Sequence, residues 1–281
     1  MMDPQSFIGR CQVDEDIADP ARFVRLAATL DHDQPPWLEG MVPPLGHWLC
    51  FQPDARHSNV GPDGHPVRSD TGLLPNVDLP RRMWAGSRVE FRREIEKGAA
   101  IRRVSTLVAA TPKSGRSGEM LFVTVRHEIG ERDGEAAIVE EQDIVYREAA
   151  APGAPLARPA VAVEGDDEVV RIVAPDPVML FRYSALTFNS HRIHYDRDYA
   201  RDEEGYPGLV VQGPLIATLL MDHLLRQKAG RKIARYSFRA MSPMYDGEEM
   251  RLGLAYESGQ ARLRAIGPVG VAMTAQADFS A

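Results

Sequence analysis

Cysteine is scarce in this sequence: only Cys11 and Cys50 occur in 281 residues, and neither belongs to a metal-binding or disulfide-forming pattern. The scarcity excludes a disulfide framework and a cysteine-based zinc site, and it favours a reducing compartment. No uninterrupted apolar run approaches the roughly 18 residues that a membrane helix needs. The first residues also lack the basic and then apolar order of a secretion signal. We therefore expect a cytoplasmic protein with no membrane partner.

An excess of positive charge is also missing. The chain has 33 lysines and arginines against 40 acidic residues, a formal net charge of −7, and contains no basic run. A nucleic-acid partner is disfavoured, because DNA and RNA are bound through a basic face. The 44% content of hydrophobic residues is ordinary for a globular protein, and the length suits two domains or one large one.

Alanine and proline are concentrated in one segment near the middle of the chain. Apolar periodicity disappears there, and prolines stiffen the backbone and remove hydrogen-bond donors. We interpret residues 149–167 as a linker between an N-terminal half, residues 1–148, and a C-terminal half, residues 168–281.

Each half is expected to contain a helix followed by strands. Asp19 and Pro20 suit the N-cap and first position of a helix that runs to about Leu30. A second helix is predicted from Pro214 to Gly230, and it is apolar over most of its circumference, which indicates burial. Alternating patterns and turn residues predict strands at 89–95, 100–109, 119–129, 136–146, 234–241, 250–256, 261–266 and 271–279.

This order predicts an α+β protein made of two copies of a helix wrapped by a curved antiparallel sheet. The stretch from Asp31 to Leu79 contains no predicted element. A loop of that length is usually functional or lies across the core.

Reactive side chains are densest between Asn189 and Asp196. His194 suits a general acid or base, because imidazole titrates near neutral pH. The amide of Asn189 can orient a water or a carbonyl but cannot titrate. Gly213 begins the second helix, where free N–H groups favour a developing oxyanion. Taken singly, each feature is more often structural. The His191–His194 spacing is not a zinc-enzyme pattern, so we expect no metal.

Two segments, residues 186–200 and 208–221, resemble the MaoC-like hotdog hydratases, also called (R)-specific enoyl-thioester hydratases. His194, Tyr195 and Asp196 fit the family motif. Asn189 stands where that family has its catalytic Asp, and His191 where it has Asn. Together with residues 79–86 and the two-half layout, the match is nearest to double-hotdog proteins. That subgroup contains the type 2 hydroxyacyl-thioester dehydratases and the mesaconyl- and itaconyl-CoA hydratases.

The resemblance implies a double hotdog fold in which only the C-terminal half carries the active-site motif. It implies reversible addition of water across the α,β double bond of an acyl thioester, without a cofactor. Carried over, His194 is the acid and base, the Gly213 N–H is the oxyanion donor, and Asn189 orients the water. The second titrating group is left open between His191 and Asp196. Loss of the usual Asp is also compatible with an inactive enzyme.

The resemblance also implies the substrate contacts. Arg81, Arg82 and Arg192 are candidates for binding the distal carboxylate of a short dicarboxylic acyl-CoA of the itaconyl or mesaconyl type. Gln212 and Asp196 are further substrate-binding candidates. Alternatives are a 3-hydroxyacyl-carrier-protein dehydratase of fatty-acid synthesis and a non-catalytic acyl-CoA-binding protein. We expect either a monomer with an internal pseudo-dimer or a homodimer.

Overall fold

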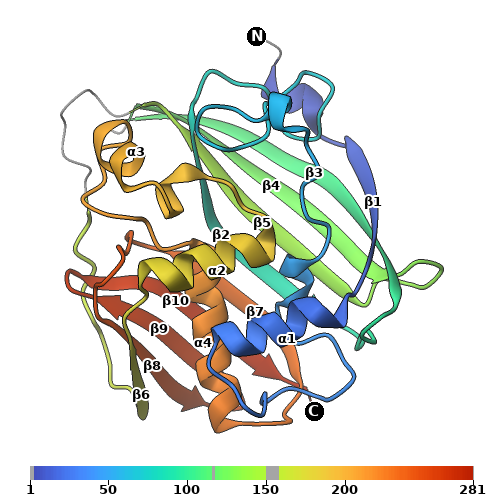
Figure 1. Ribbon diagram of the computed structural model, residues 1–281, viewed down its shortest axis with the longest axis vertical. Coiled ribbons are helices and arrows are strands. Elements are labelled where there is room, and N and C mark those ends of the chain that lie inside the picture. The colour runs from blue at the N-terminus through green and yellow to red at the C-terminus, as the bar shows by residue number, and fades with distance from the viewer. Residues whose placement is uncertain (1–2, 116–117, 150–157, 281) are drawn as a thin grey trace.

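A single ten-stranded antiparallel sheet forms the framework of the protein (Figure 1). The computed structural model describes residues 3–115, 118–149 and 158–280. The strand order is β1-β3-β4-β5-β2-β7-β10-β9-β8-β6. The strands are β1 (Cys11–Ile17), β2 (Arg81–Phe91), β3 (Ala100–Gly115), β4 (Gly118–Glu131), β5 (Ile138–Arg147), β6 (Val169–Val173), β7 (Ile233–Ala240), β8 (Met250–Glu257), β9 (Gln260–Gly267) and β10 (Gly270–Phe279).

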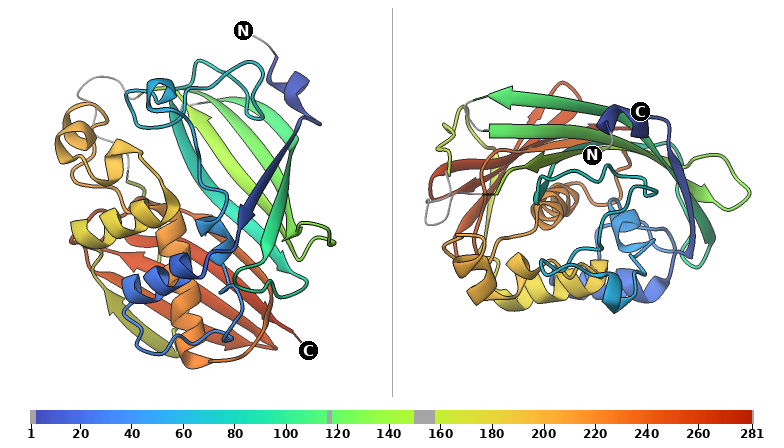
Figure 2. Two further views of the ribbon diagram at one scale, coloured as in Figure 1. Left: turned by 45° about the vertical axis from the view of Figure 1, so that its right-hand side comes forward. Right: turned by 90° about the horizontal axis from the view of Figure 1, so that it is seen from above.

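The two halves of the chain meet in the middle of this sheet. Strand β2 of the first half pairs with β7 of the second, from Gly86 opposite Arg239 to Glu90 opposite Arg235. The halves therefore share one curved sheet (Figure 2). They also share one main hydrophobic core.

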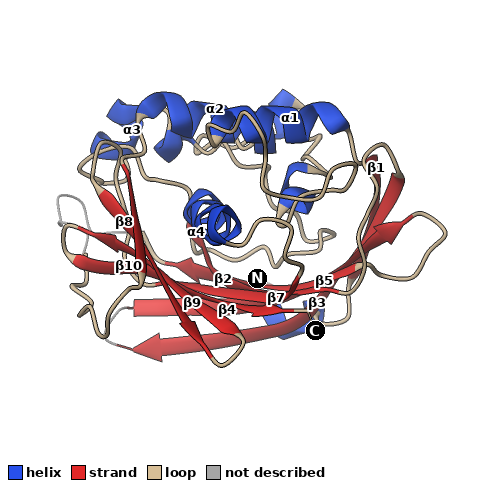
Figure 3. Ribbon diagram, turned by 90° about the horizontal axis from the view of Figure 1, so that it is seen from below, coloured by secondary structure: helices blue, strands red, loops and turns tan. Residues whose placement is uncertain are grey.

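Helices cover the concave face in two layers (Figure 3). Helix α4 (Gly213–Gln227) lies next to the sheet, and α1 (Pro20–Thr29), α2 (Pro177–Thr187) and α3 (Arg197–Asp202) form the outer layer. Every residue of α4 from Leu215 to Leu225 is buried, which confirms the prediction of a buried helix. The predicted end at Gly230 is wrong, because Lys228 caps the last turn by donating to the carbonyls of Leu224 and Leu225.

The predicted strands are present, most of them longer than expected. Strand β2 starts at Arg81 rather than Val89, and the hairpin between β4 and β5 is confirmed. Strands β1 and β6 and helices α2 and α3 were not predicted from the sequence. Strand β1 is a largely exposed edge strand with three consecutive acidic residues, so it shows no apolar alternation. Helix α2 did carry a start signal, since Asp176 caps it and Pro177 is its first residue.

In the first half, a short 3-10 helix, Gly46–Leu49, faces the sheet, and α1 lies beside α2 in the outer layer. The indole of Trp48 donates to Glu140 on β5, which fixes this short helix against the strand. Residues 150–157 of the predicted linker lie outside the described residues, so the domain boundaries remain a prediction. Among the helices that the structure describes, none is long and apolar enough to span a membrane.

Candidate active site

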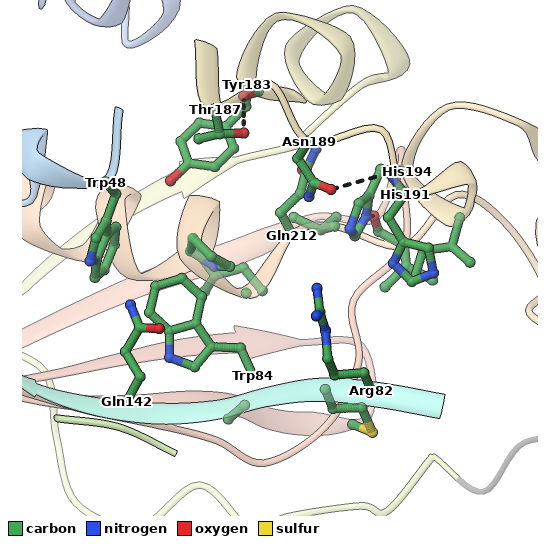
Figure 4. Close-up of a pocket in the computed structure, with 18 of the residues that line it drawn as sticks. Trp48, Arg82, Trp84, Gln142, Tyr183, Thr187, Asn189, His191, His194 and Gln212 are labelled. Atoms are coloured by element: carbon green, nitrogen blue, oxygen red, sulfur yellow. Dashed lines mark hydrogen bonds between the residues drawn. The ribbon is translucent and has the colours of Figure 1, made fainter. Parts of the chain in front are cut away.

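A cavity of about 490 Å³ opens between the N-terminus of α4, strand β2 and the segment that follows α2. Both halves of the chain line it, and the close-up in Figure 4 shows its labelled side chains. Seven residues predicted from the sequence line this cavity: Arg81, Arg82, Asn189, His191, His194, Gln212 and Gly213. The structure thus brings together residues from β2, from the α2–α3 connection and from the start of α4.

His194 presents one ring nitrogen to the cavity. Its Nδ1 lies 2.7 Å from the backbone oxygen of Val210. Because a carbonyl can only accept, Nδ1 carries the proton and Nε2 keeps its lone pair. Burial lowers the pKa of His194 to about 4, so the ring is neutral at physiological pH. A neutral imidazole with a free Nε2 can accept a proton from water.

The start of α4 supplies a backbone donor. Gly213 is the first residue of the helix, and its N–H has no acceptor within the helix. A Cβ placed on Gly213 would have the Trp84 carbonyl oxygen, at 3.8 Å, as its one close neighbour. A ligand can therefore approach this N–H closely, and the positive end of the helix dipole favours a negatively charged oxygen there.

Gln212 precedes this glycine and fastens α4 to α2. Its Nε2 donates to the Leu180 carbonyl at 2.9 Å and to Ser184 Oγ at 3.0 Å. The side-chain Oε1 is buried and has no partner among the described residues. Gln212 therefore holds the start of α4 against α2.

Asn189 follows the abrupt end of α2. Phe188 adopts a left-handed conformation with φ of 49°, and the Asn189 N–H returns to the Ser184 carbonyl. The Asn189 Oδ1 accepts from the backbone N–H of His191 at 3.1 Å. With its oxygen engaged in this turn, Asn189 offers the cavity the two donors of its Nδ2 group.

His191 is held in the neutral form. Burial, and then the neighbouring His65 and His194 rings, lower its pKa to about 2. His191 therefore lines the cavity as a neutral imidazole, and the identity of the second titrating group stays a prediction. Its ring centroid lies 5.3 Å from that of His194 and 4.1 Å from that of His65.

Asp63 and His65 complete the cluster around His191 and His194. Neither residue was predicted from the sequence. His65 Nδ1 lies 3.0 Å from Asp63 Oδ2, and both residues line the cavity. Burial alone would raise the pKa of Asp63, but hydrogen bonds from the side chain and backbone of His65 hold it well below its usual range. The length of the 31–79 loop was the available signal, and it does not point to particular residues.

The same cluster offers donor atoms of the kind that bind metals. One ligand atom each from Asp63, His65 and His191 lie within 4.8 Å of one another. Two imidazoles and a carboxylate suit a divalent transition metal. In the structure, however, the Asp63 carboxylate is hydrogen-bonded to His65, so the pair forms a complete interaction without an ion.

The Asp63–His65 segment is fastened to the segment after α2. Ser190 Oγ donates to the Gly64 carbonyl, and the Arg192 N–H donates to the Asp63 carbonyl at 2.9 Å. Gly64 has a φ of 91°, and a Cβ there would lie 1.8 Å from the Ser190 carbonyl oxygen. Only glycine permits this approach, which places a loop of the first half against the catalytic segment of the second.

Arg192 and Asp196 do not line the cavity, which corrects the expectation that they contact substrate. The Arg192 guanidinium is bound to Asp196 Oδ2 at 2.8 Å and to the Pro62 carbonyl at 3.0 Å, and it stacks over Tyr199. Asp196 also caps α3 by accepting from the Tyr199 N–H. The pair therefore anchors the loop from outside the cavity.

Among the described residues, three arginines line the cavity, and they differ in their partners. Arg81 is paired with Glu204 and Arg103 with Asp14. Arg82 forms no ion pair with any carboxylate in the part of the chain that the structure describes. Figure 4 shows Arg82 pointing from β2 toward the side of the cavity where Asn189 and His194 lie.

The opposite side of the cavity is aromatic and then polar. Trp48 and Trp84 pack edge to face with ring centroids 5.0 Å apart. Glu140 lies beyond them, fully buried, and accepts from Trp48 and from His47. Burial would raise the pKa of Glu140, but the hydrogen bond and charge interaction with His47, together with smaller contributions from His127 and Ser87, lower the value to about 2.

A neutral imidazole and a helix-end N–H that face one cavity define an enzyme that acts beside a carbonyl group. The comparisons with known proteins identify the family. Residues 45–246 match the family described as hydroxyacyl-thioester dehydratase type 2. The chain therefore belongs to this family, and it is a hydro-lyase that acts on acyl thioesters.

A curated relative supports the family, and two solved structures support the fold. A mesaconyl-C(4)-CoA hydratase of Chloroflexus aurantiacus is 45% identical over 269 residues, which cover 95% of this chain and 94% of that protein. A MaoC-like dehydratase from Phytophthora capsici has a similar structure, with a TM-score of 0.73, 12% identity and coverage of 98% and 97% of the two chains. A Mycobacterium tuberculosis protein described as a double hotdog aligns with a TM-score of 0.57, 11% identity and coverage of 97% and 96%. The double hotdog expected from the sequence is confirmed.

Proposed function

We propose that the protein hydrates a short dicarboxylic acyl-CoA of the mesaconyl type. The observation that carries the proposal is the position of Arg82, whose guanidinium lies in the cavity without a carboxylate partner among the described residues. An unpaired cation in a partly buried cavity favours an anionic ligand group. The name of the Chloroflexus relative supports a substrate with a free carboxylate.

The remaining lining residues take the other parts of such a substrate. The Gly213 N–H accepts the charge that develops on the thioester oxygen. His194 Nε2 takes a proton from water and later returns it to the α-carbon. The Asn189 amide donates a hydrogen bond to the substrate or the water.

One chain supplies the whole site. The second half provides His194, Asn189 and Gly213, and the first half provides Arg82 and the loop with Asp63. This completeness suits a monomer with an internal pseudo-dimer, and it is also compatible with a homodimer of complete sites.

We place the protein in the cytoplasm, because Cys11 and Cys50 are both free thiols.

The test is a substrate panel assayed with the purified protein. Mesaconyl-C4-CoA, itaconyl-CoA and crotonyl-CoA are compared by the loss of enoyl absorbance, with the His194→Ala protein from a parallel preparation as the blank. We expect kcat/KM for a diacid to exceed that for crotonyl-CoA by about tenfold or more, since a charge-assisted hydrogen bond contributes about 1.5–3 kcal/mol. Equal or better turnover of crotonyl-CoA would contradict the diacid proposal and favour a 3-hydroxyacyl-carrier-protein dehydratase.

A further inference from the structure

We propose that His65, oriented by Asp63, is a second catalytic residue, which holds the attacking water jointly with His194. The inference rests on the proposed hydration and assigns a role to residues of the first half of the chain. Asn189 Oδ1 already accepts from the His191 N–H, which leaves that oxygen one further lone pair. His65 adds another acceptor to the cavity lining for a water that also donates to His194.

The tautomer of His65 follows from its partner. An ionised carboxylate can only accept, so the 3.0 Å contact between His65 Nδ1 and Asp63 Oδ2 places the proton on Nδ1. The lone pair is then on Nε2. His194 has the same tautomer for a different reason, because its Nδ1 donates to the Val210 carbonyl. The cavity lining thus contains two neutral imidazoles whose free acceptor is Nε2 in each case.

The two Nε2 atoms can accept the two O–H groups of one water molecule. A water that donates one O–H to each Nε2 keeps its oxygen lone pairs for the β-carbon. The His191 ring neighbours both of the other rings, with centroid distances of 4.1 Å to His65 and 5.3 Å to His194. His191 is itself neutral, because burial and then the neighbouring His65 and His194 rings lower its pKa.

The reaction step balances with these groups. The O–H bond that faces His194 breaks, its proton passes to Nε2, and the oxygen forms a bond to the β-carbon. The π electron pair moves to the thioester oxygen at the Gly213 N–H. The proton on His194 then passes to the α-carbon as the carbonyl re-forms. His65 keeps the second O–H as its hydrogen-bond donor throughout and ends in its starting state.

The hydrogen bonds of the loop hold His65 in a fixed position beside the cavity. The segment Pro62–His65 is bound to residues 190–192 through the Asp63, Gly64 and Pro62 carbonyls. The close approach at Ser190 requires the glycine at position 64. The side chain of His65 retains 18% exposure, so its ring reaches the cavity surface instead of being sealed in the core.

Three substitutions of His65 separate catalysis from loop docking. His65→Gln keeps an acceptor near the position of Nε2, whereas His65→Asn keeps a donor to Asp63 near the position of Nδ1. We expect kcat to fall about 100-fold in His65→Ala and His65→Asn and distinctly less in His65→Gln, with KM within about threefold. His57→Ala, an exposed histidine of the same loop, is the matched control and should leave kcat unchanged.

If His65 serves only to hold the loop through its bond to Asp63, His65→Asn should be more active than His65→Gln. That order of activities would overturn the proposal. It is also overturned if His65→Ala retains more than about a third of the wild-type kcat. Loss of activity with a chelator and its recovery with Zn²⁺ would assign the cluster to a metal instead.

The tautomers can be measured without any substrate. Nitrogen-15 NMR of histidine-labelled protein at pH 7 should show His65 and His194 both protonated on Nδ1, and Asp63→Asn should shift His65 toward the Nε2–H form, since an amide can donate to Nδ1. A wild-type His65 that is charged or carries its proton on Nε2 would refute the inference. If the protein turned over none of the thioesters in the panel, the proposed substrate would be refuted. The NMR measurement of the His65 tautomer would then still decide the inference about His65.

Discussion

The backbone carbonyl of Val210 accepts a hydrogen bond from His194 Nδ1 at 2.7 Å, and this contact decides which ring nitrogen faces the cavity. The same burial that fixes the ring lowers its pKa to about 4. The geometry therefore prepares a base that is unprotonated and correctly oriented before substrate binds.

Replacing His194 by alanine should remove this base. We expect kcat to fall by at least about 100-fold, the usual contribution of a general acid–base group. The thermal midpoint should stay close to that of His57→Ala, measured by differential scanning fluorimetry. More than a tenth of wild-type kcat in a properly folded His194→Ala protein would rule out His194 as the base.

The pH dependence of kcat/KM should reflect the lowered pKa. The neutral form of His194 is the active base, and its folded-state pKa of about 4 lies below the ordinary value of about 6.5. Activity should therefore remain nearly constant as the pH falls from 7 to 5 and decline only as it approaches 4. A decline centred near pH 6.5 in stopped-flow assays would show that the titrating base is not this buried ring.

The donor at the head of α4 can be tested with a pair of substitutions. Gly213→Pro removes the N–H, and proline is compatible with the first helical position after Gln212, whose φ and ψ are −59° and 131°. We expect kcat to fall about 100- to 1,000-fold, as for loss of one oxyanion donor. Gly213→Ala keeps the N–H and is the control. Similar kcat values in the two variants would exclude this role.

Arg82→Gln should separate diacid from monoacid substrates. Loss of a charge-assisted hydrogen bond worth about 1.5–3 kcal/mol should lower kcat/KM for the dicarboxylic thioester about 10- to 100-fold. The value for crotonyl-CoA should change little. Arg102→Gln, at an exposed arginine on β3, is the control. An equal loss for both substrates would mean that Arg82 acts on the thioester and not on the distal carboxylate.

Gly64→Ala should displace the loop that carries Asp63 and His65. The added Cβ would overlap the Ser190 carbonyl oxygen, and φ of 91° disfavours alanine. We expect kcat to fall about as far as in His65→Ala, with a small loss of stability. Gly72→Ala is the control in the same loop, where the nearest atoms lie 3.4 Å from an added Cβ. Full activity in Gly64→Ala would show that the docking is dispensable.

Much of the framework could be predicted because it depends on local pattern. The apolar circumference of α4, the caps at Asp19 and Pro20, and the alternation in β4 and β5 each express a preference of their own residues. Strand β1 could not be predicted, because an exposed edge strand is defined by its pairing with β3 and not by burial of its side chains.

The candidate site was predicted in part for the same reason. His194, Asn189 and Gly213 lie in two short segments of one half, so their order along the chain was informative. Arg192 was expected to bind substrate because it is close to His194 in the sequence. That proximity does not show that its guanidinium is bound to Asp196 outside the cavity. Asp63 and His65 were missed, since nothing in a glycine- and proline-rich loop shows where that loop docks.

The sequence by itself determined the α+β class, the buried helix with a glycine at its head, and a histidine capable of acid–base chemistry. Only the tertiary structure decided which nitrogen of His194 is free, which arginine lacks an acidic partner, and which loop of the first half meets the second. The reason is physical: helix and strand patterns are set by neighbours along the chain. Protonation and pairing are set by groups that become neighbours only when the chain folds.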